Sequence, residues 1–290
     1  MRPDWYQATI EESPSRVLEV VGKLGHEMRP ADQLARKHRY EQGFTVLHND
    51  LGAVAHIFVG GNGGKPHALA TSEAAVPFMD LVRTEWPDRH LVTRVDPAQD
   101  FIEPSGYDRL RSVALKIAQE HRMRFAQHVD ELNPMAGRTQ YIGSTSSEYR
   151  GRLYEKGLEM IAKQERKLQD VGGRILDTDS GELINPEDLV RLELQARPKG
   201  EPARRFAAQA TMEQIWGMTD WAHELAREAM ALDLERAFIR TRKRSKDEEA
   251  LRWMCQQYGG VLARRQGVLE GWAALGEELG QIIAQQVQHQ

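Results

Sequence analysis

Polar and apolar residues alternate along several short stretches in the first two-thirds of the chain. Such alternation is typical of β-strands, because successive side chains point to opposite faces of a sheet. The turn-rich residues 49–52 and the glycine-rich run Gly60–Gly64 separate some of these stretches, as hairpin connections do. The expected strands are Trp5–Ile10, Phe44–His48, Val54–Val59, His67–Thr71, Leu91–Phe101, Tyr141–Gly143, Arg150–Lys156 and Leu189–Arg197.

Between these stretches, apolar residues recur at the three- and four-residue spacing of helices. Ser72 and Ser105 each precede such a segment, and we expect them to be N-caps because a serine hydroxyl can accept a hydrogen bond from the first helical turn. The expected helices cover residues 15–24, 73–86, 106–122 and 158–170.

From Ala203 onward the spacing is helical, and Leu251–Leu262 and Val268–Ile283 are expected helices. The pattern as a whole predicts an α+β protein, in which an antiparallel-rich central sheet has flanking helices and a helical C-terminal region follows. We expect the sheet domain to span residues 1–200 and the helical region to span residues 201–290.

One of the expected strands gathers cations around a phenol. In Arg150–Lys156, the side chains of Arg150, Arg152, Tyr154 and Lys156 all point to one face. Such a surface would hold a phosphate next to a hydroxyl that could attack phosphorus.

Two further strands carry charged residues on single faces. Arg94 and Asp96 share a face of the strand Leu91–Phe101. In the strand Leu189–Arg197, one face likewise carries Arg191, Glu193, Gln195 and Arg197. With the tyrosine strand, three strands thus carry carboxylates, cations and a phenol on single faces.

Phosphodiester chemistry would use these residue types. Asp96 and Glu193 on adjacent strands would bind a hard divalent cation through oxygen, and Mg²⁺ or Mn²⁺ are the expected ions. Arginines would bind the non-bridging oxygens of the phosphate in bidentate fashion. A free tyrosine has a pKa of ~10, so neighbouring cations would help Tyr154 to act as a phenolate.

The same spacing has plainer interpretations. Mixed charges on a sheet face are typical of a solvated surface or of cross-strand ion pairs, and a tyrosine between arginines is typical of packing. The spacing of the residues by itself leaves the function undecided.

The charge balance limits where nucleic acid could bind. The chain has 290 residues and a formal net charge of −4, so binding requires local basic surface. The run Arg240–Lys246 offers such a surface, with a solvated helix face or loop as the alternative. Its predicted DNA contacts are Arg242, Lys243 and Arg244.

Cysteine content and hydropathy bear on the compartment. Cys255 is the only cysteine, which excludes an internal disulfide and a cysteine-rich zinc site and fits a reducing cytoplasm. No apolar run approaches the ~20 residues of a membrane span, and the N-terminus lacks a signal-peptide core. We therefore expect a cytoplasmic protein without a membrane partner.

Four motifs, in order, resemble those of the replication initiation factor family. This family contains the rolling-circle initiators of plasmids and phages and the related relaxases of conjugative elements. The resemblance covers roughly residues 40–215. The motifs are Leu91–Asp100, Gly137–Ser144, Arg152–Glu159 and Arg191–Arg197.

The resemblance implies an origin-specific nicking and rejoining endonuclease. Such enzymes attack one DNA strand with a tyrosine, which leaves a 5′-phosphotyrosine link and a free 3′-hydroxyl that primes synthesis. By this resemblance Tyr154 is the nucleophile, and Lys156 and Arg152 bind and neutralise the phosphate. The implied metal ligands are Asp96, Glu193 and, with a less defined role, Glu159. The further expected DNA contacts are Arg94, Arg150, Arg191 and Arg197.

Two features depart from the family pattern. Many members carry an arginine shortly after the Gly-Ser pair, where this chain has Thr145. No His-hydrophobe-His triplet occurs, so the histidine metal site of other single-strand nickases is absent from the sequence. A metal would therefore be bound by carboxylates, which favours Mg²⁺ or Mn²⁺ over zinc.

The expected partner is origin DNA, as a hairpin or a single-stranded nick site. A host helicase and a second copy of the chain are further candidate partners. Two other functions stay open at this point: a non-cleaving DNA-binding replication accessory protein with the same fold, and a protein whose polar faces are structural ion-pair networks.

Overall fold

The computed structural model describes residues 1–133, 136–162, 170–171, 174–176, 181, 183–231, 237 and 246–287. The chain forms two compact units, Met1–Arg240 and Thr241–Gln290. Among the described residues, the first unit contains the sheets and most of the helices, and the second contains two helices.

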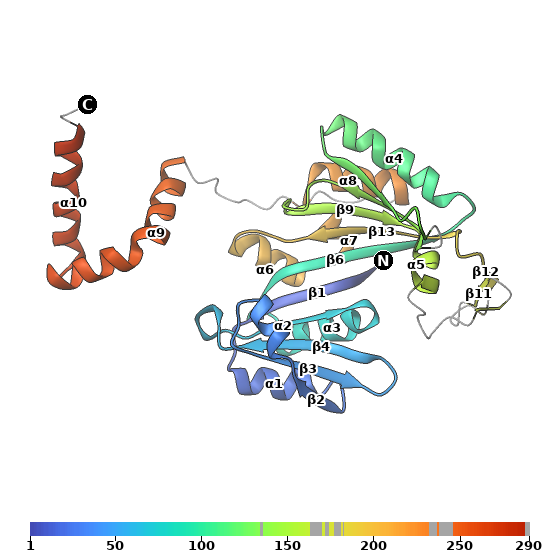
Figure 1. The fold of residues 1–290 in the computed structure, drawn as a ribbon, viewed down its shortest axis with the longest axis horizontal. Coiled ribbons are helices and arrows are strands. Elements are labelled where there is room, and N and C mark those ends of the chain that lie inside the picture. The colour runs from blue at the N-terminus through green and yellow to red at the C-terminus, as the bar shows by residue number, and fades with distance from the viewer. Residues whose placement is uncertain are drawn as a thin grey trace. The chain divides into compact units, whose positions relative to one another are not determined.

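A ten-stranded sheet forms the centre of the first unit, in the order β2-β3-β4-β5-β1-β6-β13-β9-β8-β7 (Figure 1). Its described pairings are all antiparallel. The α+β class with an antiparallel-rich sheet is thereby confirmed. The strands are β1 (Arg2–Ile10), β2 (Glu27–Pro30), β3 (Gln42–His48), β4 (Gly52–Val59), β5 (His67–Thr71), β6 (His90–Ile102), β7 (Phe125–Val129), β8 (Arg138–Ile142), β9 (Tyr149–Tyr154) and β13 (Leu189–Ala196).

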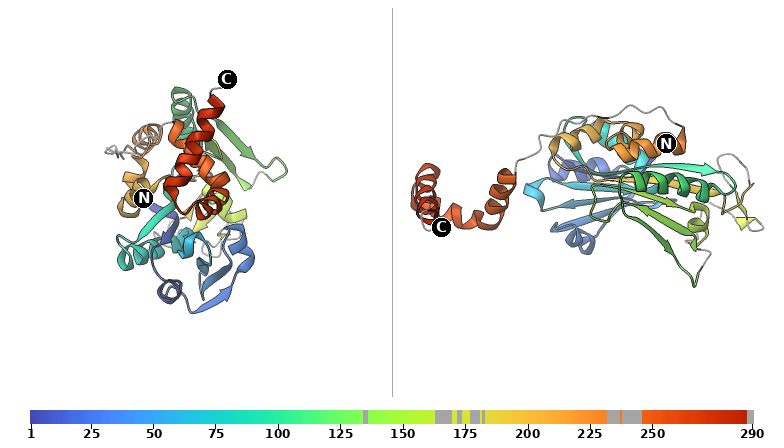
Figure 2. Two further views of the ribbon diagram at one scale, coloured as in Figure 1. Left: turned by 90° about the vertical axis from the view of Figure 1, so that its left-hand side faces the viewer. Right: turned by 90° about the horizontal axis from the view of Figure 1, so that it is seen from above.

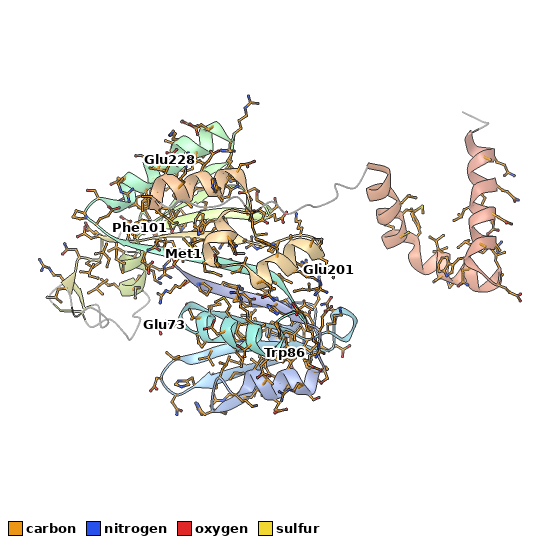
Figure 3. The ribbon with its side chains drawn as sticks, turned by 180° about the vertical axis from the view of Figure 1, so that it is seen from behind. Met1, Glu73, Trp86, Phe101, Glu201 and Glu228 are labelled. Carbon is orange, nitrogen blue, oxygen red and sulfur yellow. The ribbon has the colours of Figure 1, made fainter. Side chains whose placement is uncertain are left out.

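Helices cover one face of this sheet. They are α1 (Pro14–Gly22), α3 (Ala75–Glu85), α4 (Gly106–Glu120), α6 (Glu201–Gln209), α7 (Met212–Trp216) and α8 (Asp220–Met230). In Figure 3, α3, α6 and α8 lie in front of the strands, and α8 also packs on α4 (Figure 2). The main core lies between these helices and the sheet, where alternate residues of β13 such as Val190, Leu192 and Leu194 are buried.

The opposite face carries much less helix. Helix α2 (Asp32–Lys37) packs on β3 at one end of the sheet, and α5 (Lys156–Ala162) packs on β13 near the other (Figure 1). We call this side of β1, β6, β13, β9 and β8 the open face. A small second sheet is formed by β10 (Asp170–Val171), β11 (Arg174–Leu176) and β12 (Leu183–Ile184).

The local predictions fail in a few places. Strands β2 and β7 and helix α2 were not expected, because each is short and few of its residues are buried. Ser72 is not an N-cap, because it lies in a short 3-10 turn and α3 begins only at Ala75. Ser105 does occupy the N-cap position of α4, but its side chain makes no capping hydrogen bond.

The helix predicted for residues 158–170 is also shorter than expected. Helix α5 ends at Ala162 and Asp170 belongs to β10, while residues 163–169 lie outside the described part.

The second unit contains α9 (Lys246–Val268) and α10 (Trp272–Val287). The sequence placed a boundary after residue 200, whereas the first compact unit continues to Arg240. The reason is that α6, α7 and α8 bury apolar residues such as Ala207, Trp216 and Leu225 in the sheet's own core. Within the described residues, no helix has the length and apolar character that a membrane crossing requires.

Candidate functional site

The open face brings the three charged strands together. β13 lies between β6 and β9, with Arg191 opposite both Asp100 and Tyr154. Glu193 is directly opposite Arg152, and Gln195 is directly opposite Arg150. The antiparallel pairing therefore gathers the charged residues of three strands into one site.

Asp96 is buried beneath an arginine. Its side chain is only 2% exposed, and Arg94 donates to both carboxylate oxygens, with Nε at 3.0 Å from Oδ1 and 2.9 Å from Oδ2. The guanidinium of Arg94 in turn lies 3.9 Å from the centre of the Trp5 ring. Burial raises the pKa of Asp96, and the charge of Arg94 opposes that rise. Trp5 thus helps to hold Arg94 against Asp96.

Glu193 is equally buried but poorly compensated. Its residue exposure is 2%, and Oε2 accepts no hydrogen bond; Arg152 Nη1 lies 3.9 Å away. Gln195 Nε2 donates to Oε1 over 3.5 Å, at the outer limit for a hydrogen bond. Burial, and then repulsion from Asp96 and Asp4, raises the pKa of Glu193. Two acidic groups with raised pKa values therefore lie close together.

Tyr154 lies at the end of β9, beneath Arg152. The guanidinium carbon of Arg152 is 4.0 Å from the centre of the Tyr154 ring, and the tyrosine is 2% exposed. Burial raises the pKa of the phenol, and the negative charge of Glu193 adds to the rise. The surroundings of the phenol are charged as well as apolar, since Arg191 and Glu159 also act on it electrostatically.

Glu159 is engaged by two cations. Arg152 Nη2 donates to its Oε1 over 3.2 Å, and Lys156 Nζ donates to its Oε2 over 3.1 Å. All three side chains are largely covered, with 25%, 11% and 16% of Arg152, Lys156 and Glu159 exposed. The short helix α5 positions this group, because both Lys156 and Glu159 lie in its first turn. The expected strand is therefore wrong at its end: β9 stops at Tyr154, and Lys156 belongs to the helix.

Arg150 and Arg197 form the most cationic part of the open face. Neither has a carboxylate within ion-pair distance among the described residues. Burial lowers the pKa of Arg197, and the charge of Arg94 lowers it further. Arg150 lies 3.9 Å from the centre of the Tyr141 ring, and burial lowers its pKa as well. Guanidinium groups in such surroundings are suited to binding an anion.

Arg191, which the sequence suggested as a DNA contact, is buried and paired with two carboxylates. Its side chain is 3% exposed, and it donates through Nε and Nη2 to Asp100 at 2.5 and 2.7 Å and through Nη1 to Asp4 at 2.5 Å. With these donors taken, it joins β1, β6 and β13 beneath the site.

Sequence reasoning did not assign Asp4, Trp5 or Asp100 to the site. Asp100 shares a strand face with Arg94 and Asp96, so the alternation contained the signal. Asp4 was missed because β1 begins at Arg2, three residues before the expected strand.

Two other tyrosines lie on β8 and β9, and of these Tyr149 is on the opposite face from Tyr154 while Tyr141 is on the same face. Tyr149 points to the helix-covered side, where its hydroxyl donates to Met218 Sδ over 3.8 Å. Tyr141 is in β8, opposite Arg152, and shares the open face with Tyr154. Arg242, Lys243 and Arg244 lie outside the described residues.

The acidic residues can be tested for their fit to a metal. Among the described residues, no three His, Cys, Asp or Glu side chains converge as a ready metal site. The charges of Asp96 and Glu193 nevertheless repel each other across the neighbouring strands β6 and β13, and the buried Glu193 Oε2 lacks a hydrogen bond. An oxygen pair of this kind fits a hard divalent cation that keeps several waters. Glu159 is turned toward Arg152 and Lys156 instead.

No protein-family model matches the sequence, and no curated protein matches it. Among solved structures, the chain is similar to a rolling-circle replication initiator protein from Geobacillus stearothermophilus. The two share 19% sequence identity with a TM-score of 0.48, and the match covers 86% of this chain and 89% of that chain. At that identity and score, the similarity does not bear on what this chain does.

Proposed function

We propose that the chain is a metal-dependent DNA nicking and rejoining enzyme that acts at an origin through a 5′-phosphotyrosine intermediate. It would initiate rolling-circle replication or the transfer of a mobile element. The observation that carries this proposal is the grouping of a phenol, two buried carboxylates and guanidinium groups without carboxylate partners on one sheet face. A structural ion-pair network would be expected to satisfy its members, and this one does not.

The cations would bind and orient the DNA backbone. Farther along this face, Arg150 and Arg197 can bind phosphates of neighbouring nucleotides through paired hydrogen bonds, while Arg152 lies against Tyr154, where the reacting phosphate would bind. Binding a phosphate there would require Arg152 to shift from the Tyr154 ring, because the guanidinium covers the phenol. Arg191 would act from below by holding the strands in register.

The covalent step exchanges one ester bond for another. The Tyr154 oxygen attacks phosphorus, the bond from phosphorus to the 3′ oxygen breaks, and the 5′ phosphate stays on the tyrosine. The phenolic proton passes from the attacking oxygen to water, and the departing 3′ oxygen takes up a proton, for which Lys156 is our candidate donor. The reverse attack by the 3′-hydroxyl restores the phosphodiester without ATP.

Asp96 and Glu193 would hold the Mg²⁺ or Mn²⁺. When bound, the ion would offset negative charge that develops on the phosphate. Within the chain, Arg94 opposes the rise that burial causes in the pKa of Asp96, and Arg191 opposes the rise that burial causes in the pKa of Tyr154. Origin DNA is the proposed substrate, and a host helicase and a second copy of the chain remain proposed partners.

A second candidate is a DNA-binding replication accessory protein that does not cut. It is favoured by the 2% exposure of Tyr154 and by the Arg94 guanidinium that occupies both oxygens of Asp96. Under this alternative the cations bind DNA, but neither the phenol nor the metal takes part.

A cleavage assay separates the two candidates. The purified protein is incubated with Mn²⁺ and a supercoiled plasmid carrying its own origin, beside Tyr154→Phe and the matched control Tyr149→Phe, which changes the other face of the same strand. We expect nicked circles from wild type and Tyr149→Phe, and a loss of at least ~10³-fold in Tyr154→Phe. Retarded DNA without nicking by wild type would favour the accessory protein and contradict the enzyme.

A further inference from the structure

Buried polar atoms without hydrogen bonds concentrate at one point of the open face. The described residues contain seven such side-chain atoms, and four of them belong to Arg150, Arg152, Glu193 and Gln195. The atoms are Nε of both arginines, Oε2 of Glu193 and Oε1 of Gln195. Because buried polar groups normally have partners, such a group of atoms calls for an explanation.

The register places these four residues in a compact block. Glu193 is opposite Arg152 and Gln195 is opposite Arg150, so β13 contributes two oxygens and β9 contributes two N–H donors. Neighbouring strands are ~4.8 Å apart and alternate residues ~7 Å apart, so the four residues are within reach of one cation and one phosphate bound next to each other. We call it the Arg/Gln block.

The β13 residues and the β9 residues of the block suit ligands of opposite charge. Unpartnered carboxylate and amide oxygens suit a hard cation, while guanidinium N–H groups suit a phosphate. Asp96 faces Gln195 from β6, since Ala196 pairs with Val95 and Glu193 with Ala98. A divalent cation beside a phosphate would thus meet a donor or an acceptor at each of the four unpartnered atoms.

We infer that the Arg/Gln block binds a divalent cation and a DNA phosphate together, with Gln195 as a cation ligand beside Glu193, and that each ligand strengthens binding of the other. This inference rests on the proposed function, whose phosphate-binding site it completes.

The coupling follows from the charges. A cation alone at Glu193 and Gln195 faces the positive Arg150 and Arg152 across ~5 Å, which weakens its binding. A phosphate alone between the arginines faces the buried carboxylate of Glu193. When both are bound, each cancels the repulsion that the other meets, and the effect on the two affinities is equal by linkage.

The test measures binding rather than cleavage. Free Mn²⁺ is followed by electron paramagnetic resonance during titration of the full-length protein, with and without a saturating oligothymidine of ~12 nucleotides, which lacks the origin. We expect the oligonucleotide to tighten Mn²⁺ binding ~10-fold, and Mn²⁺ to tighten oligonucleotide binding by the same factor. Equal Mn²⁺ affinities with and without DNA in wild type would overturn the inference without reference to any variant.

Variants then assign the roles. Gln195→Met should weaken Mn²⁺ binding ~10-fold, and Arg150→Gln should leave Mn²⁺ binding without DNA no weaker while removing most of the coupling. The matched control is Gln140→Met, since Gln140 is a second glutamine with a buried, unpartnered Oε1 but faces the helices from β8. Its Mn²⁺ binding and coupling should equal those of wild type.

The outcomes distinguish this inference from the function on which it rests. If wild type binds Mn²⁺ and Glu193→Gln abolishes binding while Gln195→Met does not weaken it, the role of Gln195 is wrong and the enzyme proposal stands. If plasmid nicking by Tyr154 fails but the coupling is present, the block binds ions and the enzyme proposal is wrong.

Discussion

The two faces of β13 are buried to the same degree by different means. Val190, Leu192 and Leu194 are at most 1% exposed and face the helices, while Arg191 and Glu193 on the other side of the same strand are 3% and 2% exposed. On the first face burial stabilises the fold through the hydrophobic effect. On the second it costs free energy, because charges leave water and Glu193 is incompletely compensated.

The contrast explains why the open face is a better candidate for function than its exposure suggests. A fold gains little by burying carboxylates with raised pKa values, whereas perturbed pKa values cluster at functional sites. We therefore expect substitutions on the helix face and on the open face to change the stability of the protein differently.

The largest change in stability is expected on the helix face. Leu194→Ala should lower the free energy of unfolding by about 3 kcal/mol, because a fully buried side chain is replaced by a cavity. Urea denaturation measures the loss. A change below about 1 kcal/mol would show that the helices do not pack on β13 as described.

A smaller loss is expected from the ion pairs of the open face. Arg191→Met should cost about 2 kcal/mol, because it leaves Asp4 and Asp100 without their shared cation, although both can still reach water. Arg2→Met is the matched control, since Arg2 also pairs with Asp100 but is half exposed at 3.8 Å, and it should cost less than about 1 kcal/mol. Equal losses in the two variants would contradict a central structural role for Arg191.

The smallest effect has the opposite sign and depends on pH. The native pKa of Glu193 is raised above its ordinary value of 4.5, so its contribution to stability is complete below pH 4.5 and is lost as the pH rises. Glu193→Gln should therefore be more stable than wild type by about 1 kcal/mol at pH 8, with the gap closing toward pH 5. Thermal denaturation across this range measures it; a gap that does not change with pH would mean that Glu193 is solvated in the native protein.

Much of the architecture could be predicted from alternation and spacing. The strand β13 alternates strictly, and β9 placed Arg150, Arg152 and Tyr154 on one face as expected, whereas a register shift at Thr93 interrupts the alternation of β6. The edge strands β2 and β7 were not predicted, because few of their residues are buried and their sequences therefore show no apolar periodicity.

The site could be predicted only in outline. Periodicity gives the face of a residue but not its neighbours on other strands, so the pairing of Arg94 with Asp96 and of Glu159 with Arg152 and Lys156 came only from the structure. The burial of Tyr154 beneath Arg152 could not be predicted from the sequence either, because it depends on how two side chains lie on a twisted sheet.

The most direct test of the central proposal is to find which residue becomes esterified to DNA. After incubation with origin plasmid and Mn²⁺ and digestion of the DNA, trypsin releases Tyr154 in the tetrapeptide Leu153–Lys156, whereas Tyr141 and Tyr149 fall together in Thr139–Arg150. Mass spectrometry should find the nucleotide on the tetrapeptide. A nucleotide on Thr139–Arg150, or no adduct while the plasmid is nicked, would contradict the assignment of Tyr154 as nucleophile.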